Sequence, residues 1–418
     1  MNAIEVFCPG SVANISCGFD ILGLCLDSIG DTMRVKKVSK KGITIKSISG
    51  YNLSLKTNEN AAGVSALALL NQYKNIDYGF EIEIIKKISR DNDKSVKDKL
   101  HQGIVSLGIN NILIPEKNGG LGLDLLFATA VAQSLGEGIA TLPFLGSYVM
   151  APISIKYGAN DSQKEFYFNR MSKNEVNFCI GFSEFFGARD QSNLIFSNNV
   201  VNGKTFFVID SDYASHIMLA NEDGKIGVVS MESSGIEIID LITVDKTRVF
   251  KEMHFKNVEI ELLEETISSK DAINNAIDAG RIIAAADSLG ASQAMINKAV
   301  DYSKERKQFN RVIGSFQAVK HMCAEMTSEL EPCYSLVWHA AHSFDNNEKN
   351  KKLMACHAKS HVSDVSKVIS KKSTEVHGGM GFTDLLGLHY WFKRIGVNRH
   401  LLGSPEIVRE EAAKSQGF

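Results

Sequence analysis

The chain has 418 residues, of which 44% are hydrophobic and 22% are charged. This length allows two or three domains with separate cores, and the composition is typical of globular proteins rather than disordered or fibrous ones. The formal net charge of -2 gives no reason to expect a nucleic acid or an anionic membrane surface as a partner.

The first part of the chain mixes strand and helix patterns. Isoleucines largely alternate with polar residues over 43–48, which predicts a strand, and the alternation returns over 80–84. Between them, residues 60–73 have a helical composition with a loose apolar stripe. We therefore expect an α/β segment over residues 1–88.

Four segments follow it. Residues 89–99 carry many charges and no aromatic side chain, so we expect a linker there, or a helix that is exposed on most sides. Residues 100–176 have a helical pattern, whereas residues 177–268 change to the period of two that is typical of a β-domain. Residues 269–418 are helical again and predict a C-terminal bundle. The expected fold class is multidomain α+β.

Two local patterns support this division. The dipeptide Asp223-Gly224 lies between two alternating apolar runs and supplies the positive φ that a hairpin turn needs. In the expected bundle, apolar residues recur every three or four positions over 316–344, which predicts a helix packed along one face. Small residues over 280–291 would let a neighbouring helix or a ligand approach closely.

The cysteines and the N-terminus restrict the compartment. The seven cysteines are scattered and form no C-x-x-C pair, which fits reduced thiols rather than a disulfide framework or a zinc site. The N-terminus has no basic flank followed by an apolar core, and no run of 18 apolar residues occurs. We expect a cytoplasmic protein with no membrane span and no metal site.

The segment FCPGSVANISCGFDILGLCLD, from Phe7 to Asp27, resembles the opening of homoserine kinase, a GHMP small-molecule kinase. The likeness continues through NENAAGVSALALL and GFEIEIIKKI, so residues 1–88 resemble an N-terminal fragment of that family. The resemblance implies that Asn14 and Asp20 bind the amino-acid substrate. An aspartate is suited to pair with a substrate ammonium.

This likeness ends directly before the phosphate loop. GHMP kinases hold ATP with P-x-x-x-G-[LI]-G-S-S-[AS], whose backbone N–H groups cradle the phosphates, and no such string occurs in this chain. The nearest run, residues 119–122, lacks both serines. Phosphoryl transfer without this loop loses its positioning and its charge neutralisation. We therefore expect no homoserine kinase activity.

Residues 96–418 resemble an N-terminally truncated acyl-CoA dehydrogenase, a flavoprotein that desaturates acyl thioesters. The resemblance rests on blocks in the family's order, which are LGINNILIPEKNGGLGLDL, FSEFFGARD, TFFVID, YSKERKQF, SFQAVKH and EVHGGMGFT. It implies a helical segment, a β-domain and a helical bundle. It also implies FAD as cofactor, an acyl-CoA substrate and an electron-transferring flavoprotein as acceptor.

The resemblance implies a flavin site that two subunits share. Ser183 replaces the family's threonine and keeps a hydroxyl for a flavin oxygen. Arg306 would reach across the subunit interface to the cofactor pyrophosphate, which a guanidinium can hold in bidentate fashion. Glu375 stands where the family usually has glutamine. Supporting residues would be Gln308, Phe309 and Gln317 beside the arginine, and Gly378, Gly379 and Gly381, whose backbone N–H groups would approach the adenosine diphosphate.

Desaturation also needs a carboxylate that takes the α-proton, a role worth about 10²–10⁴ in rate. The family places this glutamate before a glycine near the C-terminus, or on the helix that precedes the R-x-Q-F block. The matched positions here are Leu402 and Gly280, and neither is acidic. The base is therefore unassigned, and Asp278 is the nearest candidate in sequence.

The leading prediction is an FAD-dependent oxidoreductase of acyl-CoA dehydrogenase type, oligomeric, with a kinase-like segment where the family has further N-terminal helices. One alternative is a catalytically silent fusion product, or a non-catalytic partner subunit of a heteromeric dehydrogenase. Homoserine kinase is a second alternative, which the absent phosphate loop disfavours.

Overall fold

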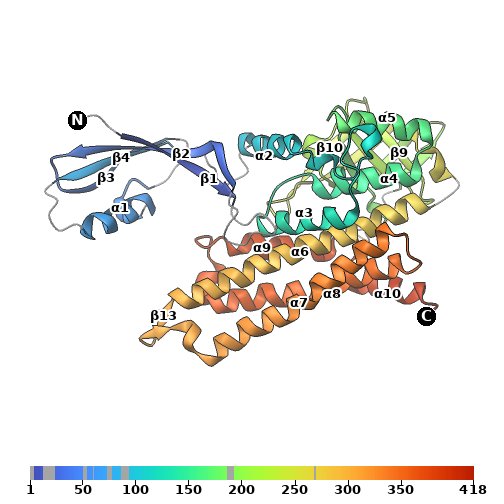
Figure 1. The fold of residues 1–418 in the computed structure, drawn as a ribbon. Coiled ribbons are helices and arrows are strands. Elements are labelled where there is room, and N and C mark those ends of the chain that lie inside the picture. The colour runs from blue at the N-terminus through green and yellow to red at the C-terminus, as the bar shows by residue number, and fades with distance from the viewer. Residues whose placement is uncertain are drawn as a thin grey trace. The chain divides into compact units, whose positions relative to one another are not determined.

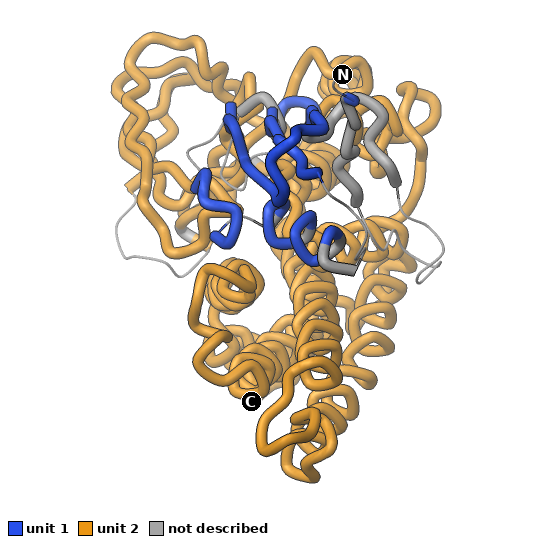
Figure 2. The backbone as a smooth tube through the Cα atoms, turned by 90° about the vertical axis from the view of Figure 1, so that its left-hand side faces the viewer, with its two compact units in different colours: residues 1–100 blue, residues 101–418 orange. Residues whose placement is uncertain are grey.

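The computed structural model describes residues 4–12, 24–49, 54–59, 61–72, 78–85, 94–185, 193–267 and 270–418. The chain divides into two compact units, residues 1–100 and 101–418 (Figure 2). Asn14 and Asp20, which we expected to bind a substrate, lie outside the described residues. The two units are described in turn below with the labels of Figure 1.

The first unit contains a four-stranded sheet in the order β1-β2-β4-β3. Its strands are β1 (Ile4–Val12), β2 (Leu24–Val38), β3 (Gly42–Ser49) and β4 (Gly79–Ile85). Strands β3 and β4 are parallel, and helix α1 (Ala61–Gln72) lies in the crossover that parallel neighbours require. Ile45, Ile82 and Ile84 form the core. The strand, helix and strand that the pattern indicated are confirmed.

Helix α2 (Lys94–Ser106) begins within the segment 89–99, so residues 94–99 form the helix that we expected as the alternative to a linker. Ile104 of α2 packs against the main core of the second unit, so the abundant charges of this segment can occupy the solvated side of a helix. The helices that follow are α3 (Leu125–Glu137), the π-helical segment η4 (Phe144–Met150), α4 (Ala151–Gly158) and α5 (Asp161–Ser172).

A β-domain follows these helices, with seven strands in the order β10-β11-β7-β5-β8-β9-β12 and β6 paired to β7. The hairpin expected at Asp223-Gly224 is confirmed, since β8 and β9 are antiparallel and Gly224 has φ of 82°. The strands are β5 (Phe178–Gly181), β6 (Ile195–Ser197), β7 (Val200–Ile209), β8 (His216–Ala220), β9 (Ile226–Ser230), β10 (Ile236–Leu241), β11 (Phe250–Glu259) and β12 (Glu261–Leu262).

A helical bundle forms the C-terminal part, coloured yellow to red in Figure 1. Its helices are α6 (Asp271–Glu305), α7 (Gln317–Asp345), α8 (Lys351–His377), α9 (Leu388–His400) and α10 (Pro405–Ser415). Helix α6 is central, because it packs against α3, α7, α8 and α9. Every residue over 275–292 of α6 is buried.

Two glycines bring α3 and α6 together. A Cβ built on Gly290 of α6 would lie 1.8 Å from the carbonyl oxygen of Gln133, and one on Gly136 of α3 would lie 2.0 Å from that of Asp287. No side chain fits at either place, because both close contacts are with rigid backbone atoms. The close approach expected from the small residues of this helix is confirmed, and its partner is α3.

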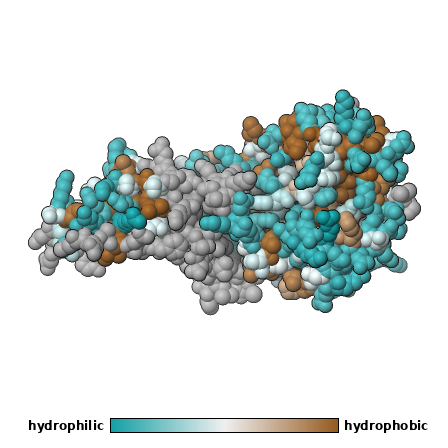
Figure 3. Space-filling model, turned by 90° about the horizontal axis from the view of Figure 1, so that it is seen from above, coloured by the Kyte–Doolittle hydropathy of each residue, from teal (hydrophilic) through white to brown (hydrophobic). Residues whose placement is uncertain are grey.

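Apolar residues, brown in Figure 3, appear among polar ones on the face of the second unit seen there. In the β-domain, the edge strand β10 and the loop after it expose Ile238, Ile239, Ile242 and Val244. Among the described residues, no helix is both long enough and apolar enough to cross a membrane.

Candidate active site

Two sequence blocks that are far apart in the chain meet at one end of the bundle. The ring of Tyr302, near the end of α6, lies 4.6 Å from the ring of His377, the last residue of α8. Residues 302–317 and 377–382 are therefore neighbours, and we call them the bundle end. They include all of the residues that the sequence pattern assigned to the pyrophosphate and adenosine side of a cofactor.

The first block forms a solvent-exposed hairpin. Strands β13 (Lys307–Gln308) and β14 (Arg311–Val312) pair around Phe309 and Asn310, whose φ angles of 51° and 61° suit a two-residue hairpin turn. The side chains of Arg306, Gln308, Phe309 and Gln317 are exposed. Arg306 makes no ion pair with any described residue, so its guanidinium is available to a ligand.

The second block exposes backbone. Gly378 and Gly379 are exposed, and a Cβ built on either would meet no atom within 4 Å. Gly378 has φ of 58° and ψ of -143°, a conformation that only glycine adopts readily. Gly381 differs, because it is buried and its Cβ would lie 2.7 Å from the carbonyl oxygen of Thr374. Gly378 and Gly379 can thus offer backbone to a ligand, while Gly381 is required by packing.

The β-domain brings two other predicted blocks together. Ser183, in the short helix η5 (Ser183–Phe185), is buried, and its hydroxyl oxygen lies 3.0 Å from that of Thr205 in β7. Segment 182–185 of FSEFFGARD therefore lies against the start of TFFVID. Residues 186–190 of the first block lie outside the described part of the chain.

The two positions where the resemblance puts a catalytic base are in contact. A Cβ built on Gly280 would lie 2.6 Å from Cδ1 of Leu402 and 3.0 Å from the sulfur of Met150. Leu402 is fully buried and has φ of 61°, which is unusual for a large residue. Both candidate positions thus lie at one place in the fold, and the side chains at this place are apolar.

Asp278 lies on another side of α6. Residues two apart are about 200° apart around a helix, so Asp278 and Gly280 face different neighbours. The Asp278 carboxylate lies 3.9 Å from Arg281, whose side chain makes two hydrogen bonds of 2.8 Å to Glu411 and donates from Nε to the Leu402 carbonyl at 2.9 Å. Burial raises the pKa of Asp278 to about 6 despite Arg281 and Lys352.

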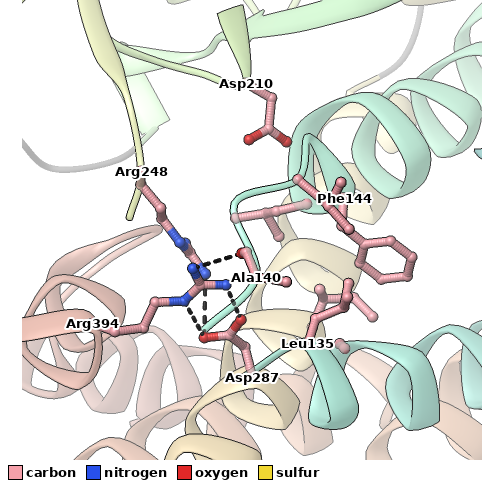
Figure 4. A pocket seen from close by; sticks show the side chains of 11 residues that line it. Leu135, Ala140, Phe144, Asp210, Arg248, Asp287 and Arg394 are labelled. Carbon is pink, nitrogen blue, oxygen red and sulfur yellow. Dashed lines mark hydrogen bonds and ion pairs between the residues drawn. The ribbon is translucent and has the colours of Figure 1, made fainter. Parts of the chain in front are cut away.

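A small cavity, lined by both apolar and charged residues, lies further along α6 (Figure 4). Asp287 accepts hydrogen bonds from Arg394 Nη2 at 2.6 Å and from Asn398 at 2.6 Å, and Arg248 lies 3.3 Å from it. Burial alone would raise the pKa of Asp287, but the charges and hydrogen bonds of these neighbours hold it at about 2. This carboxylate is therefore ionised near neutral pH.

Asp210, which directly follows β7, differs from Asp287 because the effect of burial on its pKa exceeds that of its neighbours. It accepts a hydrogen bond of 2.5 Å from the backbone N–H of Gly146. Burial raises the pKa of Asp210 to about 6, and the opposing effects of Gly146 and Arg248 are smaller. The sequence pattern did not single out Asp210, Arg248, Asp287 or Arg394. A signal existed for Asp287, which is a charge inside a run of small apolar residues.

Comparison with known proteins shows which family the chain belongs to. The family description "Acyl-CoA dehydrogenase, N-terminal domain" matches residues 81–175, and "Acyl-CoA dehydrogenase, C-terminal domain" matches residues 271–417. The chain is 25% identical over 327 residues to a probable acyl-CoA dehydrogenase, YngJ, of Bacillus subtilis, covering 72% of this chain and 85% of that protein. It is 31% identical over 180 residues to the caffeyl-CoA reductase-Etf complex subunit CarC of Acetobacterium woodii, covering 43% of each.

The fold is that of a solved relative. Butyryl-CoA dehydrogenase from Megasphaera elsdenii superposes with a TM-score of 0.69 at 21% identity, covering 78% of this chain and 91% of that one. The order of helices, β-domain and bundle defines a flavoprotein dehydrogenase architecture. The chain belongs to the acyl-CoA dehydrogenase family.

The match to the family begins earlier than we expected. It starts at residue 81, inside β4, whereas the sequence blocks suggested residue 96. Neither family description reaches residues 1–80. None of the relatives named above is a kinase, so the likeness of the N-terminal segment to homoserine kinase stays a prediction.

Proposed function

We propose that the chain is an FAD-dependent oxidoreductase of acyl-CoA dehydrogenase type, whose reaction is α,β-desaturation of an acyl-CoA thioester. The observation that supports it best is the contact between Gly280 and Leu402. These residues are far apart in sequence, and each was matched independently to a position of the family's base. Their meeting at one point supports the alignment with the family at these two positions.

The described residues fit FAD. The exposed guanidinium of Arg306 and the open backbone at Gly378 and Gly379 suit a pyrophosphate. Gln308 and Phe309 of the same hairpin, and Gln317 at the start of α7, would support this contact, and the Ser183 hydroxyl would face the flavin ring. The family resemblance implies that a second subunit shares this ligand, and the exposure of the bundle end leaves room for one. Bound FAD would supply the acceptor for the hydride that leaves the β-carbon.

The residues around the reacting carbons can contact the acyl chain but cannot take a proton from it. Gly280, Leu402 and Met150 provide an apolar wall but no carboxylate. Without a base, removal of the α-proton is slowed by about 10²–10⁴. This favours a second candidate function, a non-catalytic subunit that lends half of a shared flavin site. Asp278 stays a possible base only if a bound substrate can reach its side of α6.

The partners follow from the family. CarC is named as a subunit of an Etf complex, which supports an electron-transferring flavoprotein as the acceptor here. The kinase-like segment, residues 1–88, carries no phosphate loop, so we assign it no phosphoryl transfer. We place the protein in the cytoplasm.

The test is cofactor retention. The purified chain should be yellow, hold FAD and form an oligomer, and Arg306→Ala should weaken FAD binding by about ten- to a hundredfold through loss of a charged hydrogen bond. Arg311→Ala, in the same hairpin, is the matched control and should change FAD binding little. A protein that stays colourless with excess FAD would contradict the proposal.

A further inference from the structure

The cavity beside α6 (Figure 4) has one donor that the protein does not use. Arg394 donates four hydrogen bonds, from Nε and Nη2 to the two oxygens of Asp287 and from Nη1 to the Ala140 carbonyl and the Thr247 hydroxyl. Arg248 contacts Asp287 with Nη2 only, and its buried Nη1 has no partner in the described part of the chain. A buried donor without a partner costs free energy, which a ligand acceptor would recover.

The rest of the cavity wall is apolar. Phe144 and Leu135 lie across from Arg248 (Figure 4), and Ile283 of α6 is among the residues that line the cavity. The free space holds about one water molecule. It therefore fits the last atoms of a chain rather than a whole ligand.

The charges around this space balance. Arg248 and Arg394 face Asp210 and Asp287, so an added carboxylate would bring a buried negative charge without a free counter-charge. A neutral oxygen would accept from Arg248 without this cost. The cavity thus selects a neutral acceptor over an anion.

The cavity adjoins the place where the acyl carbons would react. Ile283 lies one helical turn beyond Gly280 on the same side of α6, and η4 contributes Phe144 and Leu145 to the cavity and Met150 to the contact with Gly280. Asp210 directly follows β7, the strand whose TFFVID block resembles the one that covers a flavin. The cavity and the Gly280–Leu402 contact thus share α6 and η4 as neighbouring elements.

We propose that Arg248 selects acyl-CoA substrates whose acyl chain ends in a neutral hydrogen-bond acceptor, a hydroxyl or carbonyl oxygen, over saturated chains of equal length. This specificity rests on the proposed function. Arg248 acts as a specificity-determining residue and takes no part in proton or hydride transfer.

The test compares acyl-CoA affinities by calorimetry on the full chain supplied with FAD. The ligands are ω-hydroxyacyl-CoAs of four to eight carbons, saturated acyl-CoAs with the same number of heavy atoms, and ω-carboxyacyl-CoAs. At the fitting length, the hydroxyl ligand should bind about tenfold more tightly than the saturated one. Arg248→Met should abolish this preference, and Arg170→Met, an exposed arginine of α5, should preserve it.

Three results would overturn the inference. Equal binding of hydroxyl and saturated ligands at every length would remove the specificity but leave the proposed function intact. Tightest binding of the carboxyl ligand would contradict the charge balance. Binding of no acyl-CoA at all would contradict the proposed function itself. The comparison of ligands on the unmodified protein decides whether the preference for a hydroxyl exists, even if Arg248→Met does not fold.

Discussion

The bundle end and the buried middle of α6, residues 275–292, differ in what they keep of the family's site. The bundle end retains an exposed arginine and open glycine backbone, the groups that bind a dinucleotide. On the proposed function, the buried middle would keep the place of the acyl site, with Gly280 against Leu402, but not its carboxylate. Cofactor binding and proton removal would then be separable in this fold.

The largest expected effect comes from restoring a carboxylate in the buried middle. Leu402→Glu should speed flavin bleaching by an acyl-CoA by about 10²–10⁴, because its side chain starts where the family's base does. The matched control is Leu402→Gln, which has the same shape but cannot accept the proton. Equal anaerobic bleaching rates in the two variants would show that position 402 does not face the α-carbon. Gly280→Glu is a poorer test, since its Cβ already meets Leu402.

Breaking the buried charge cluster should come next in size. Arg394→Met leaves Asp287 buried with Asn398 and the more distant Arg248, and removing one partner of a buried pair costs about 3–5 kcal/mol. Urea unfolding measures this loss. Arg409→Met removes an exposed arginine that pairs with Asp364 and should change the free energy of unfolding by less than about 0.5 kcal/mol. Similar losses in the free energy of unfolding for the two variants would contradict the burial of the charge cluster.

A smaller loss of stability is expected when the contact between α3 and α6 is crowded. Gly290→Ala would place a methyl 1.8 Å from a backbone oxygen, so we expect about 1–3 kcal/mol of destabilisation from overpacking. Gly396→Ala in α9 meets no atom within 4 Å and should stabilise by about 0.5–1 kcal/mol through helix propensity. Thermal unfolding of both variants measures the contrast. A stable Gly290→Ala protein would mean that the two helices lie further apart.

The smallest effect is a pH dependence. The pKa of Asp278 is raised to about 6 in the folded protein, so between about pH 4 and pH 6 the folded state holds a proton that the unfolded state has lost. This group therefore lowers stability as pH rises through that window. Asp278→Asn should reduce the fall, although Asp210 contributes in the same direction. The control is Asp301→Asn, exposed on the same helix. Parallel stability curves for wild type and Asp278→Asn would contradict the burial.

Sequence patterns could predict the parts of this protein that depend on local chemistry. The strands around residues 43–48 and 80–84, the hairpin at Asp223-Gly224 and the long bundle helices each follow from periodicity or turn residues, and all are confirmed. Over residues 89–99 the sequence left a linker and an exposed helix open, because charge density alone does not distinguish a linker from a helix with one solvated face.

The candidate site shows the same limit. The family resemblance proposed the residues of the bundle end, yet it did not say that Tyr302 and His377 are neighbours. The cavity was missed because Asp210, Arg248, Asp287 and Arg394 come from four separate segments. Only tertiary packing brings such residues together.

The central claim, that the chain binds an acyl-CoA beside FAD and desaturates it only slowly because neither family base position carries a carboxylate, is tested most directly by one titration. The purified wild-type protein, loaded with FAD under anaerobic conditions, is titrated with acyl-CoA while the flavin absorbance is followed. The account predicts a shift of the flavin spectrum on binding and only slow bleaching. Rapid and complete bleaching of the unmodified protein would contradict it.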